Sequence, residues 1–399
     1  IPLDGVVFMR NFRWLLLWPV MMAFSADAAI MGEDSRDAAK TVFDLGLSGN
    51  RGCFGFSNAN DMLAVADYRN GMVQLYDLRE LKLRGKLTGF PQEQGLTGFV
   101  AVRFSSDDTQ LAVLLAGPQL RILDLRDQKV VHEFSPHCKG FWSAAISPDL
   151  SMLALGERGT LSLWDIKLNT RSHAIDEVFS YVWSLTFSHS GKYLASTSSF
   201  PRGWPKIWSV KAGSQVMQLD GVGTYLHTYY EYGQQKSAEL LKSGVHWSSV
   251  AFSVDDTMLA AVGPRFDRQA NGPATRYDVA TIWSVATGKK IWELELPNRV
   301  FRAIAVVPAR NCVMLAGGIE NKSVGQSDAY CVKVFALDSP RELYNLRGHT
   351  DTVQSIQVSH DGRWMATGSD DATVRLWDLT ENRELSPQAE PPSQHREGP

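Results

Sequence analysis

One stretch of the sequence holds the residue types of a nucleophilic triad. His349, Thr367 and Asp371 supply an imidazole, a hydroxyl and a carboxylate, and these groups in one hydrogen-bonded chain can activate the hydroxyl oxygen for attack. Trp377 follows them. No catalytic motif accompanies the four residues, because the chain lacks a G-x-S-x-G elbow, an H-E-x-x-H pair, a P-loop, a C-x-x-C-H haem site and an EF-hand loop. Their role therefore depends on the elements that carry them.

The cysteines give no sign of metal or redox chemistry. Cys53, Cys138, Cys312 and Cys331 have neither close Cys-Cys spacing nor a metal-ligand pattern, and the sequence leaves any disulfide connectivity open. We interpret them as small apolar residues in strands or loops. We expect no catalytic residue, no metal and no cofactor.

The elements around the four polar residues read as strands. Three short apolar runs, Val353–Ser359, Trp364–Ser369 and Val374–Leu379, are rich in β-forming residues and are separated by turn residues. They lie within the stretch Leu346–Leu385 and predict a three-stranded antiparallel meander. Because such a meander is rarely stable alone, we expect it to be one unit of a repeat.

Seven copies of this unit can be traced along the chain. Each copy has a large apolar residue before an alanine in its second strand and a large residue at a fixed point in its third strand. The second-strand pairs are Leu63-Ala64, Leu111-Ala112, Leu153-Ala154, Leu194-Ala195, Leu259-Ala260, Leu315-Ala316 and Met365-Ala366. The third-strand residues are Tyr76, Leu123, Trp164, Trp208, Trp283, Phe335 and Trp377.

The last unit resembles the WD-repeat β-propeller family. Gly348-His349 and Trp377-Asp378 match the two ends of that family's repeat, and a weaker similarity runs from about Thr41 to Leu385. The resemblance implies an all-β fold, a seven-bladed β-propeller of four-stranded antiparallel blades. It also implies that an N-terminal strand, which we place at Thr41–Leu47, closes the ring and removes exposed sheet edges.

The resemblance gives the triad-like residues a structural role. In that family the residues that match His349, Thr367, Asp371 and Trp377 form a hydrogen-bonded tetrad, and a buried network of this kind specifies packing without access to substrate. Among the other units only His137, in unit three, matches His349. The tetrad is thus carried by one unit, and other ring-repeat propellers stay open as relatives.

The N-terminal residues are typical of a secretory signal peptide. Basic residues in Met9–Arg13 precede an apolar core, Trp14–Phe24, and the cleavage pattern Ala26-Asp27-Ala28. Residues 1–8 precede Met9 and indicate a misassigned start. An uncleaved membrane anchor or a buried strand is the alternative.

These observations predict three regions. We expect a signal peptide at 1–28, the propeller at 29–385 and a disordered, Pro/Gln/Glu-rich tail at 386–399. The signal predicts an exported protein, periplasmic or secreted, without stable membrane insertion after cleavage. The formal net charge of −3 and the pI of about 6.3 argue against nucleic-acid binding, which needs an excess of Lys and Arg.

Insertions gather in units four to six. The second-strand and third-strand landmarks are 24 and 20 residues apart in units five and six, against 11 to 14 in the other units. The added segments are Ser199–Lys206, Asp220–Gly244, Gly263–Asp278 and Gly317–Tyr330. In the WD-repeat family such connections open onto one face of the disc, so the resemblance implies a decorated face over blades four to six. Long loops on a rigid scaffold often carry function.

The added segments are rich in aromatic and arginine residues, which are enriched at interface hot spots. The candidate partner-binding residues are Arg202, Trp204, Tyr225, Tyr229, Tyr230, Arg265, Arg268, Arg276 and Tyr277. The alternative is that the aromatic side chains pack the loops against each other.

The sequence therefore predicts an exported, non-enzymatic protein–protein interaction scaffold. We expect a chain that is monomeric in itself and binds a protein partner on the decorated face. An alternative is an enzyme or small-ligand binder that uses the same face or the central channel. A third hypothesis, an intracellular scaffold, requires that the N-terminal segment stay in place.

Overall fold

The computed structural model describes most of the predicted propeller. The described residues are 41–44, 53–91, 98–138, 140–157, 159–175, 181–198, 205–219, 229–231, 234–236, 247–267, 275–297, 299–319 and 330–380. The chain divides into two compact units, Ile1–Arg36 and Asp37–Pro399, and every described residue belongs to the second. The predicted signal peptide and tail lie outside the described residues.

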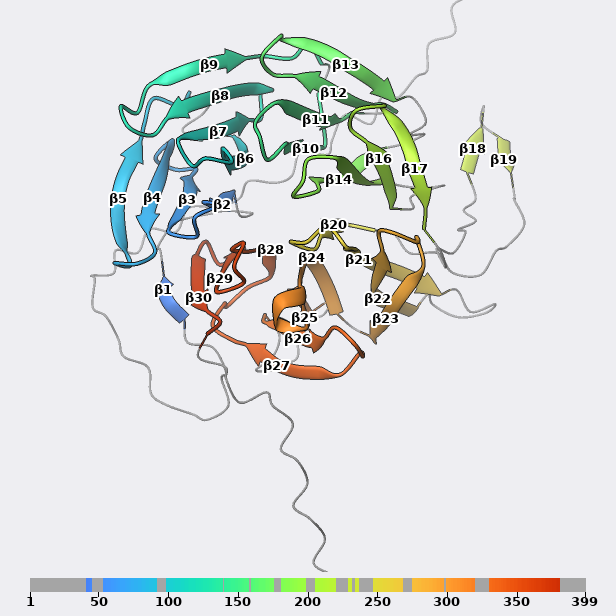
Figure 1. Ribbon diagram of the computed structural model, residues 1–399. Helices are drawn as coiled ribbons and strands as arrows, with labels where there is room; N and C mark the ends of the chain where they lie inside the picture. The colour runs from blue at the N-terminus through green and yellow to red at the C-terminus, as the bar shows by residue number, and fades with distance from the viewer. Residues whose placement is uncertain are drawn as a thin grey trace, which may run out of the picture. The chain divides into compact units, whose positions relative to one another are not determined.

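Seven four-stranded antiparallel sheets form the blades of a β-propeller (Figure 1). Blade one contains β2 (Phe54–Phe56), β3 (Met62–Asp67), β4 (Met72–Asp77) and β5 (Lys82–Leu87). Blade two contains β6 (Phe99–Phe104), β7 (Gln110–Leu115), β8 (Gln119–Asp124) and β9 (Val130–Phe134). Blade three contains β10 (Ser143–Ile146), β11 (Met152–Gly156), β12 (Leu161–Asp165) and β13 (Thr170–Ile175). Blade four contains β14 (Val182–Phe187), β15 (Tyr193–Ser198), β16 (Lys206–Ser209) and β17 (Ser214–Gln218).

The remaining blades follow the same order. Blade five contains β20 (Ser249–Phe252), β21 (Met258–Asp267), β22 (Thr275–Ser284) and β23 (Lys290–Pro297). Blade six contains β24 (Arg299–Val307), β25 (Cys312–Ile319), β26 (Val332–Ala336) and β27 (Glu342–Leu346). Blade seven contains β28 (Val353–Val358), β29 (Trp364–Ser369), β30 (Val374–Asp378) and β1 (Thr41–Asp44). A separate hairpin pairs β18 (Tyr229–Glu231) with β19 (Gln234–Lys236).

The N-terminal strand closes the ring, as the resemblance implied. β1 pairs antiparallel with β30, and Thr41 lies opposite Trp377. The first strand of the described chain thus completes the last blade and covers the outer edge of β30. The predicted closing strand and the predicted seven-bladed fold are confirmed.

Apolar residues hold neighbouring blades together. The described residues include seven clusters of buried apolar residues, and each cluster joins two adjacent blades. One of them packs Leu63 of blade one against Trp364 and Leu376 of blade seven, across the closure. Full burial of one leucine side chain contributes roughly 1.5–3 kcal/mol relative to exposure. Because both faces of each blade are covered, strands such as β7 are buried at successive residues.

A recurring turn joins the first and second strands of each blade. In six blades a serine hydroxyl accepts a hydrogen bond from the backbone N–H five residues later; these serines are Ser57, Ser105, Ser147, Ser188, Ser253 and Ser359. The residue three positions after each serine has a positive φ. Blade six differs, because Val307 replaces the serine and a 3-10 helix, η1 (Pro308–Arg310), forms the turn.

This difference corrects one sequence landmark. In the other six units the predicted second-strand residue pairs directly with the predicted third-strand residue, as Leu259 does with Trp283. In blade six Phe335 pairs with Val313 rather than with Leu315. The predicted pair Leu315-Ala316 is therefore wrong by two residues. Without the serine turn, the Leu-Ala dipeptide alone does not fix the register.

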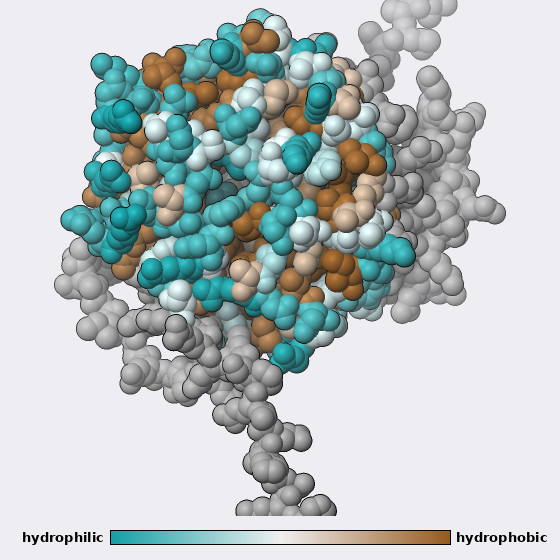
Figure 2. Space-filling view, viewed as in Figure 1, coloured by the Kyte–Doolittle hydropathy of each residue, from teal (hydrophilic) through white to brown (hydrophobic). Residues whose placement is uncertain are grey.

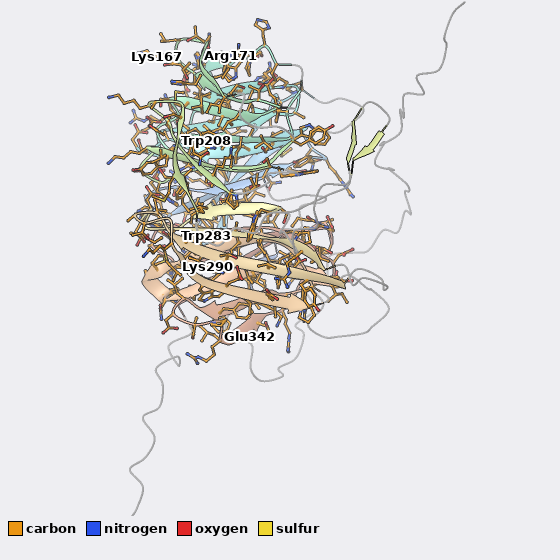
Figure 3. The ribbon with its side chains drawn as sticks, turned by 90° about the vertical axis from the view of Figure 1, so that its right-hand side faces the viewer. Lys167, Arg171, Trp208, Trp283, Lys290 and Glu342 are labelled. Atoms are coloured by element: carbon orange, nitrogen blue, oxygen red, sulfur yellow. The ribbon has the colours of Figure 1, made fainter. Side chains whose placement is uncertain are left out.

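The two faces of the propeller carry different connections. We call turn face the face with the turns between first and second strands, such as Ser253–Met258, and loop face the opposite one. The connections between second and third strands, and those between blades, lie on the loop face because successive strands are antiparallel. In the side view of Figure 3, two residues mark the turn face: Lys167, in the turn between β12 and β13, and Lys290, at the start of β23.

The four predicted insertions all belong to loop-face connections. Part of this prediction is wrong, because much of the insertion in blade five is strand rather than loop. β21 and β22 stay paired out to Asp267 and Thr275. β25 likewise extends to Ile319. No helix in the described part of the chain is long and apolar enough to cross a membrane.

Candidate functional site

The four triad-like residues form one hydrogen-bonded chain in blade seven. The Trp377 indole N–H donates to the Thr367 hydroxyl oxygen over 2.9 Å. His349 Nε2 lies 2.8 Å from the same oxygen, and His349 Nδ1 lies 2.8 Å from the Asp371 carboxylate. If Nδ1–H donates to the carboxylate, Nε2 accepts from the threonine. This is the geometry that the resemblance implied.

The burial of this hydrogen-bonded tetrad distinguishes it from a catalytic triad. Thr367 is fully buried and Trp377 is 1% exposed, so a substrate carbonyl has no path to the hydroxyl. Burial alone would raise the pKa of Asp371, but hydrogen bonds from His349, Thr373 and the Thr350 N–H lower the pKa well below its usual range. The carboxylate is therefore ionised at neutral pH, and both of its oxygens accept hydrogen bonds within the blade. The structural role of the tetrad stays a prediction.

The other matched histidine forms no such chain. His137 is exposed, and among the described residues no hydrogen bond involves it. Leu155 occupies the position of Thr367 in blade three, because Leu153 and Met365 hold the same register, so the hydroxyl that would link a histidine to Trp164 is missing. Blade four keeps half of the tetrad, where Trp208 donates to Ser196 over 2.8 Å.

The structure describes two of the candidate partner-binding side chains. Arg202, Trp204, Tyr225 and Arg268 lie outside the described residues. Tyr229 and Tyr230 lie in β18 and Arg276 lies in β22, but their side chains are outside the description. The remaining two, Arg265 and Tyr277, are half-buried neighbours on paired strands.

Arg265 is engaged within its own blade. Its Nη2 donates to Glu295 over 2.8 Å, and Nη1 also contacts that carboxylate. The guanidinium carbon lies 5.4 Å from the centre of the Tyr277 ring. This arrangement is what the packing alternative expects for these two residues, which then support the long hairpin.

A cluster of aromatic residues with two exposed tryptophans lies on the loop face and was not predicted. Trp142 and Trp183 are 57% and 40% exposed, respectively. The Trp142 ring centre lies 4.7 Å from that of Tyr181 and 5.9 Å from that of Trp183. We call Trp142, Tyr181 and Trp183 the aromatic cluster. It lies beside the first predicted insertion, because Val182 pairs with Ser198, where β15 ends.

The local fold fixes the aromatic cluster. The Ser143 hydroxyl donates to the Val182 carbonyl over 2.8 Å and so ties blade three to blade four. A Cβ on Gly156 would lie 2.5 Å from Ser143 Oγ and 2.6 Å from Val182 Cβ. Only glycine therefore permits this close approach of β11 and β14.

The two tryptophans share one position of the repeat, five residues before the turn residue of each blade. The same position holds Val100, Trp142, Trp183, Ser248, Arg302 and Gln354 in blades two to seven. In four of these blades the strand register shifts at this residue, and such a bulge re-aims a side chain. We call these residues the mouth ring. Two consecutive units with Trp-Ser here are a signal that sequence reasoning missed.

The described residues show no metal or disulfide chemistry. No group of three or more His, Cys, Asp or Glu residues among them could hold a metal ion. None of the four cysteines, all of them described residues, forms a disulfide bond. Burial raises the pKa values of Cys53 and Cys312 to about 12, so these thiols are poor nucleophiles at neutral pH.

Comparison with known proteins finds a family similarity in two segments of the chain. The family model described as "WD domain, G-beta repeat" matches residues 128–165 and 340–378. These two segments of the chain are similar to WD40 repeats. They include the two units in which the sequence places a matching histidine, His137 and His349. Proteins built from WD40 repeats are typically protein-interaction scaffolds and usually lack enzymatic activity.

Two similar proteins match a short segment of the chain. Ribosome biogenesis protein ERB1 of Debaryomyces hansenii is 44% identical over 57 residues, and the match covers 12% of this chain and 7% of that protein. The ribosome biogenesis protein BOP1 homolog of Drosophila virilis is 44% identical over 55 residues, with the same coverage. The chain thus spans a small part of these relatives.

The whole fold has a solved counterpart. A chain in the crystal structure of the mitotic checkpoint complex superposes with a TM-score of 0.61 and 17% identity, and the match covers 91% of this chain and 99% of that one. At this identity the likeness shows the fold alone.

Proposed function

We propose that this protein is a non-enzymatic interaction scaffold that binds a protein partner on its loop face. The aromatic cluster would supply the anchors, and the insertions of blades four to six would extend the contact. The proposal keeps the predicted face and adds an anchor at its edge, on blades three and four.

The exposure of the aromatic cluster carries this proposal. Buried aromatic residues stabilise a core, but Trp142 and Trp183 leave a large part of their surface in water. Grouped exposed aromatic residues are a frequent mark of interaction sites. Tryptophan and tyrosine are also among the residues that contribute most to binding energy at protein interfaces.

Rigid presentation explains how the cluster would bind. Trp183 sits at a bulge of a paired strand, and the backbone N–H of Trp142 donates to the Gly156 carbonyl over 2.8 Å. The anchors are therefore already ordered, and association loses less side-chain and loop entropy than it would with a flexible loop.

A comparison of two variants tests the proposal. The double variant Trp142→Ala/Trp183→Ala removes the anchors. The control Leu168→Ala removes a residue that is 67% exposed at a turn between third and fourth strands, on the turn face. Affinity capture from extract of the source cells, followed by quantitative mass spectrometry, should lose specific proteins with the double variant and keep them with the control. Equal recovery with both variants would contradict the site.

Export is a second part of the proposal. It rests on the sequence pattern of residues 1–28. Intact-mass measurement of the protein purified from its source should find a mature N-terminus near Ala29. A chain that retains residues 9–28 would favour the intracellular hypothesis.

A further inference from the structure

We infer that the central channel of the propeller binds a small polyvalent oxyanion of the phosphate class. This site is separate from the aromatic cluster and does not depend on the partner proposed above.

The channel is large enough for a small-molecule ligand. It holds a cavity of about 470 Å³ lined by the first strands of six blades, β2, β6, β14, β20, β24 and β28. Ligand pockets commonly have volumes of roughly 300–1,000 Å³. In Figure 2, which shows the turn face, hydrophilic residues surround the centre of the propeller.

The charges that line the cavity have one sign. Arg103 and Arg302 line it, together with His189 and His360, and none of the described lining residues is an aspartate or glutamate. The two histidine rings come from the turns of blades four and seven and lie 6.0 Å apart at the turn-face end. Asp256 lies 3.5 Å from His189 but outside the lining. The cavity therefore favours an anion although the whole chain is slightly acidic.

Arg103 is the central group of the proposed site. Its guanidinium makes no hydrogen bond or ion pair with a described residue. Asp149 attracts it from blade three, but that carboxylate already accepts hydrogen bonds from Ser147 and Ser151. Burial lowers the pKa of Arg103 to about 10, because Asp149 offsets only part of the lost hydration. The Arg103 side chain is partly buried where it lines the cavity, and a bound anion would give its charge a close partner.

Arg103 is the charged residue at its position of the repeat. The other blades hold small or neutral residues at its position: Gly55, Ala145, Thr186, Ala251, Ala305 and Gln357. On β28 the Ser355 hydroxyl, in a residue that lines the cavity, is buried and has no hydrogen-bond partner among the described residues. A buried polar atom of this kind commonly marks the place of a water or a ligand.

The spacing of the two arginines selects the kind of anion. Arg103 lies two residues before the turn of its blade and Arg302 five residues before, so the two positions differ by about 10 Å along the strand direction. A ligand with several anionic groups can use both side chains at once. The planar guanidinium binds phosphate oxygens through two parallel N–H donors.

Titration of the full-length protein with sodium tripolyphosphate, at fixed ionic strength, tests the inference by calorimetry. We expect saturable binding with one ligand per chain, at least about tenfold tighter than for inorganic phosphate. Arg103→Gln and Arg302→Gln should each weaken binding at least about tenfold. Arg171→Gln changes an exposed arginine on the outer strand β13 and should leave affinity within about twofold.

Two results would overturn the inference. One is the absence of saturable tripolyphosphate binding to the folded wild-type protein. The other is an equal loss of affinity in the control Arg171→Gln, which would assign binding to general surface charge. Because Arg302 is exposed, its variant should fold even if Arg103→Gln does not, and it then decides the test alone.

Discussion

The two faces of this propeller use their polar and aromatic residues in opposite ways. On the turn face, carboxylates bind the backbone of the neighbouring blade. On the loop face, the aromatic cluster presents side chains to solvent. The difference teaches that the turn face joins neighbouring blades, whereas the loop face leaves aromatic side chains in contact with solvent.

Two aspartates illustrate the turn face. Asp108 accepts hydrogen bonds from the Asn58 and Ala59 N–H groups of blade one over 2.8 and 2.7 Å. Asp256 accepts from the His189 and Ser190 N–H groups of blade four over 2.6 and 2.8 Å. Both aspartates occupy the positive-φ position of the recurring turn. Successive turn N–H groups form a concave site for a carboxylate.

The largest effect should come from removing the loop-face anchors. For Trp142→Ala/Trp183→Ala we expect partner affinity to fall about a thousandfold, because two hot-spot residues of about 2 kcal/mol each are lost. The melting temperature should stay within about 2 °C of wild type, since both side chains are exposed. Surface plasmon resonance with a captured partner and calorimetric melting measure the two quantities. A large loss of stability without a loss of affinity would reverse the comparison.

The tetrad should matter for stability rather than for binding. Asp371→Ala leaves the buried His349 without its carboxylate partner, and we expect the free energy of unfolding to fall by roughly 1–3 kcal/mol. Denaturant titration followed by tryptophan fluorescence measures this loss. Asp338→Ala, which changes an exposed aspartate, is the control. An unchanged unfolding curve for Asp371→Ala would remove the structural interpretation of the tetrad.

The hydrogen bonds that Asp256 accepts on the turn face should stabilise the protein in a pH-dependent way. Burial acts to raise the pKa of Asp256, but hydrogen bonds from His189 and Ser190 lower it to about 2. Because this pKa is depressed on folding, the stabilisation is present above the ordinary value of 3.8 and is lost as pH falls toward 2. Asp256→Asn should reduce stability by about 1 kcal/mol at pH 7 and have little effect near pH 2. Urea titrations of both proteins across this pH range measure the difference in free energy of unfolding. A difference that does not change with pH would contradict the stabilising role of the ionised Asp256.

The smallest effect should come from an exposed ion pair on the turn face. Arg79 is 75% exposed and lies 3.1 Å from Asp61. Arg79→Ala should change the free energy of unfolding by less than about 1 kcal/mol, because exposed pairs are screened by water and salt. A larger loss of unfolding free energy in the same urea titration would show that exposed ion pairs stabilise the turn face as well as the hydrogen bonds of Asp108 and Asp256.

The sequence predicted the fold because each repeat can be recognised from residues that are close together in the chain. Buried strands and serine turns recur at nearly constant spacing, and the closing strand followed from the family resemblance. The prediction was wrong in blade six, where Pro308–Arg310 replaces the serine turn and the register moves to Val313. It also read the strand ends around Asp267 and Thr275 as loop, because strand pairing there depends on partners across the hairpin.

The candidate site was harder to predict, because it depends on residues from different blades. Trp142 and Trp183 resemble ordinary strand residues in the sequence. Only the bulge and the close approach at Gly156 expose them together. The long insertions attracted attention because length is visible in the sequence, whereas convergence around the channel is visible only in three dimensions.

The most direct test of binding on the loop face is hydrogen–deuterium exchange of the full-length protein with and without its captured partner. We predict slower exchange on binding for the backbone around Trp142 and Tyr181–Ser184, with no change at the turns Ser57–Met62 and Ser105–Gln110. Protection confined to those turns would contradict the account, because it would place the partner on the face that holds the ring together.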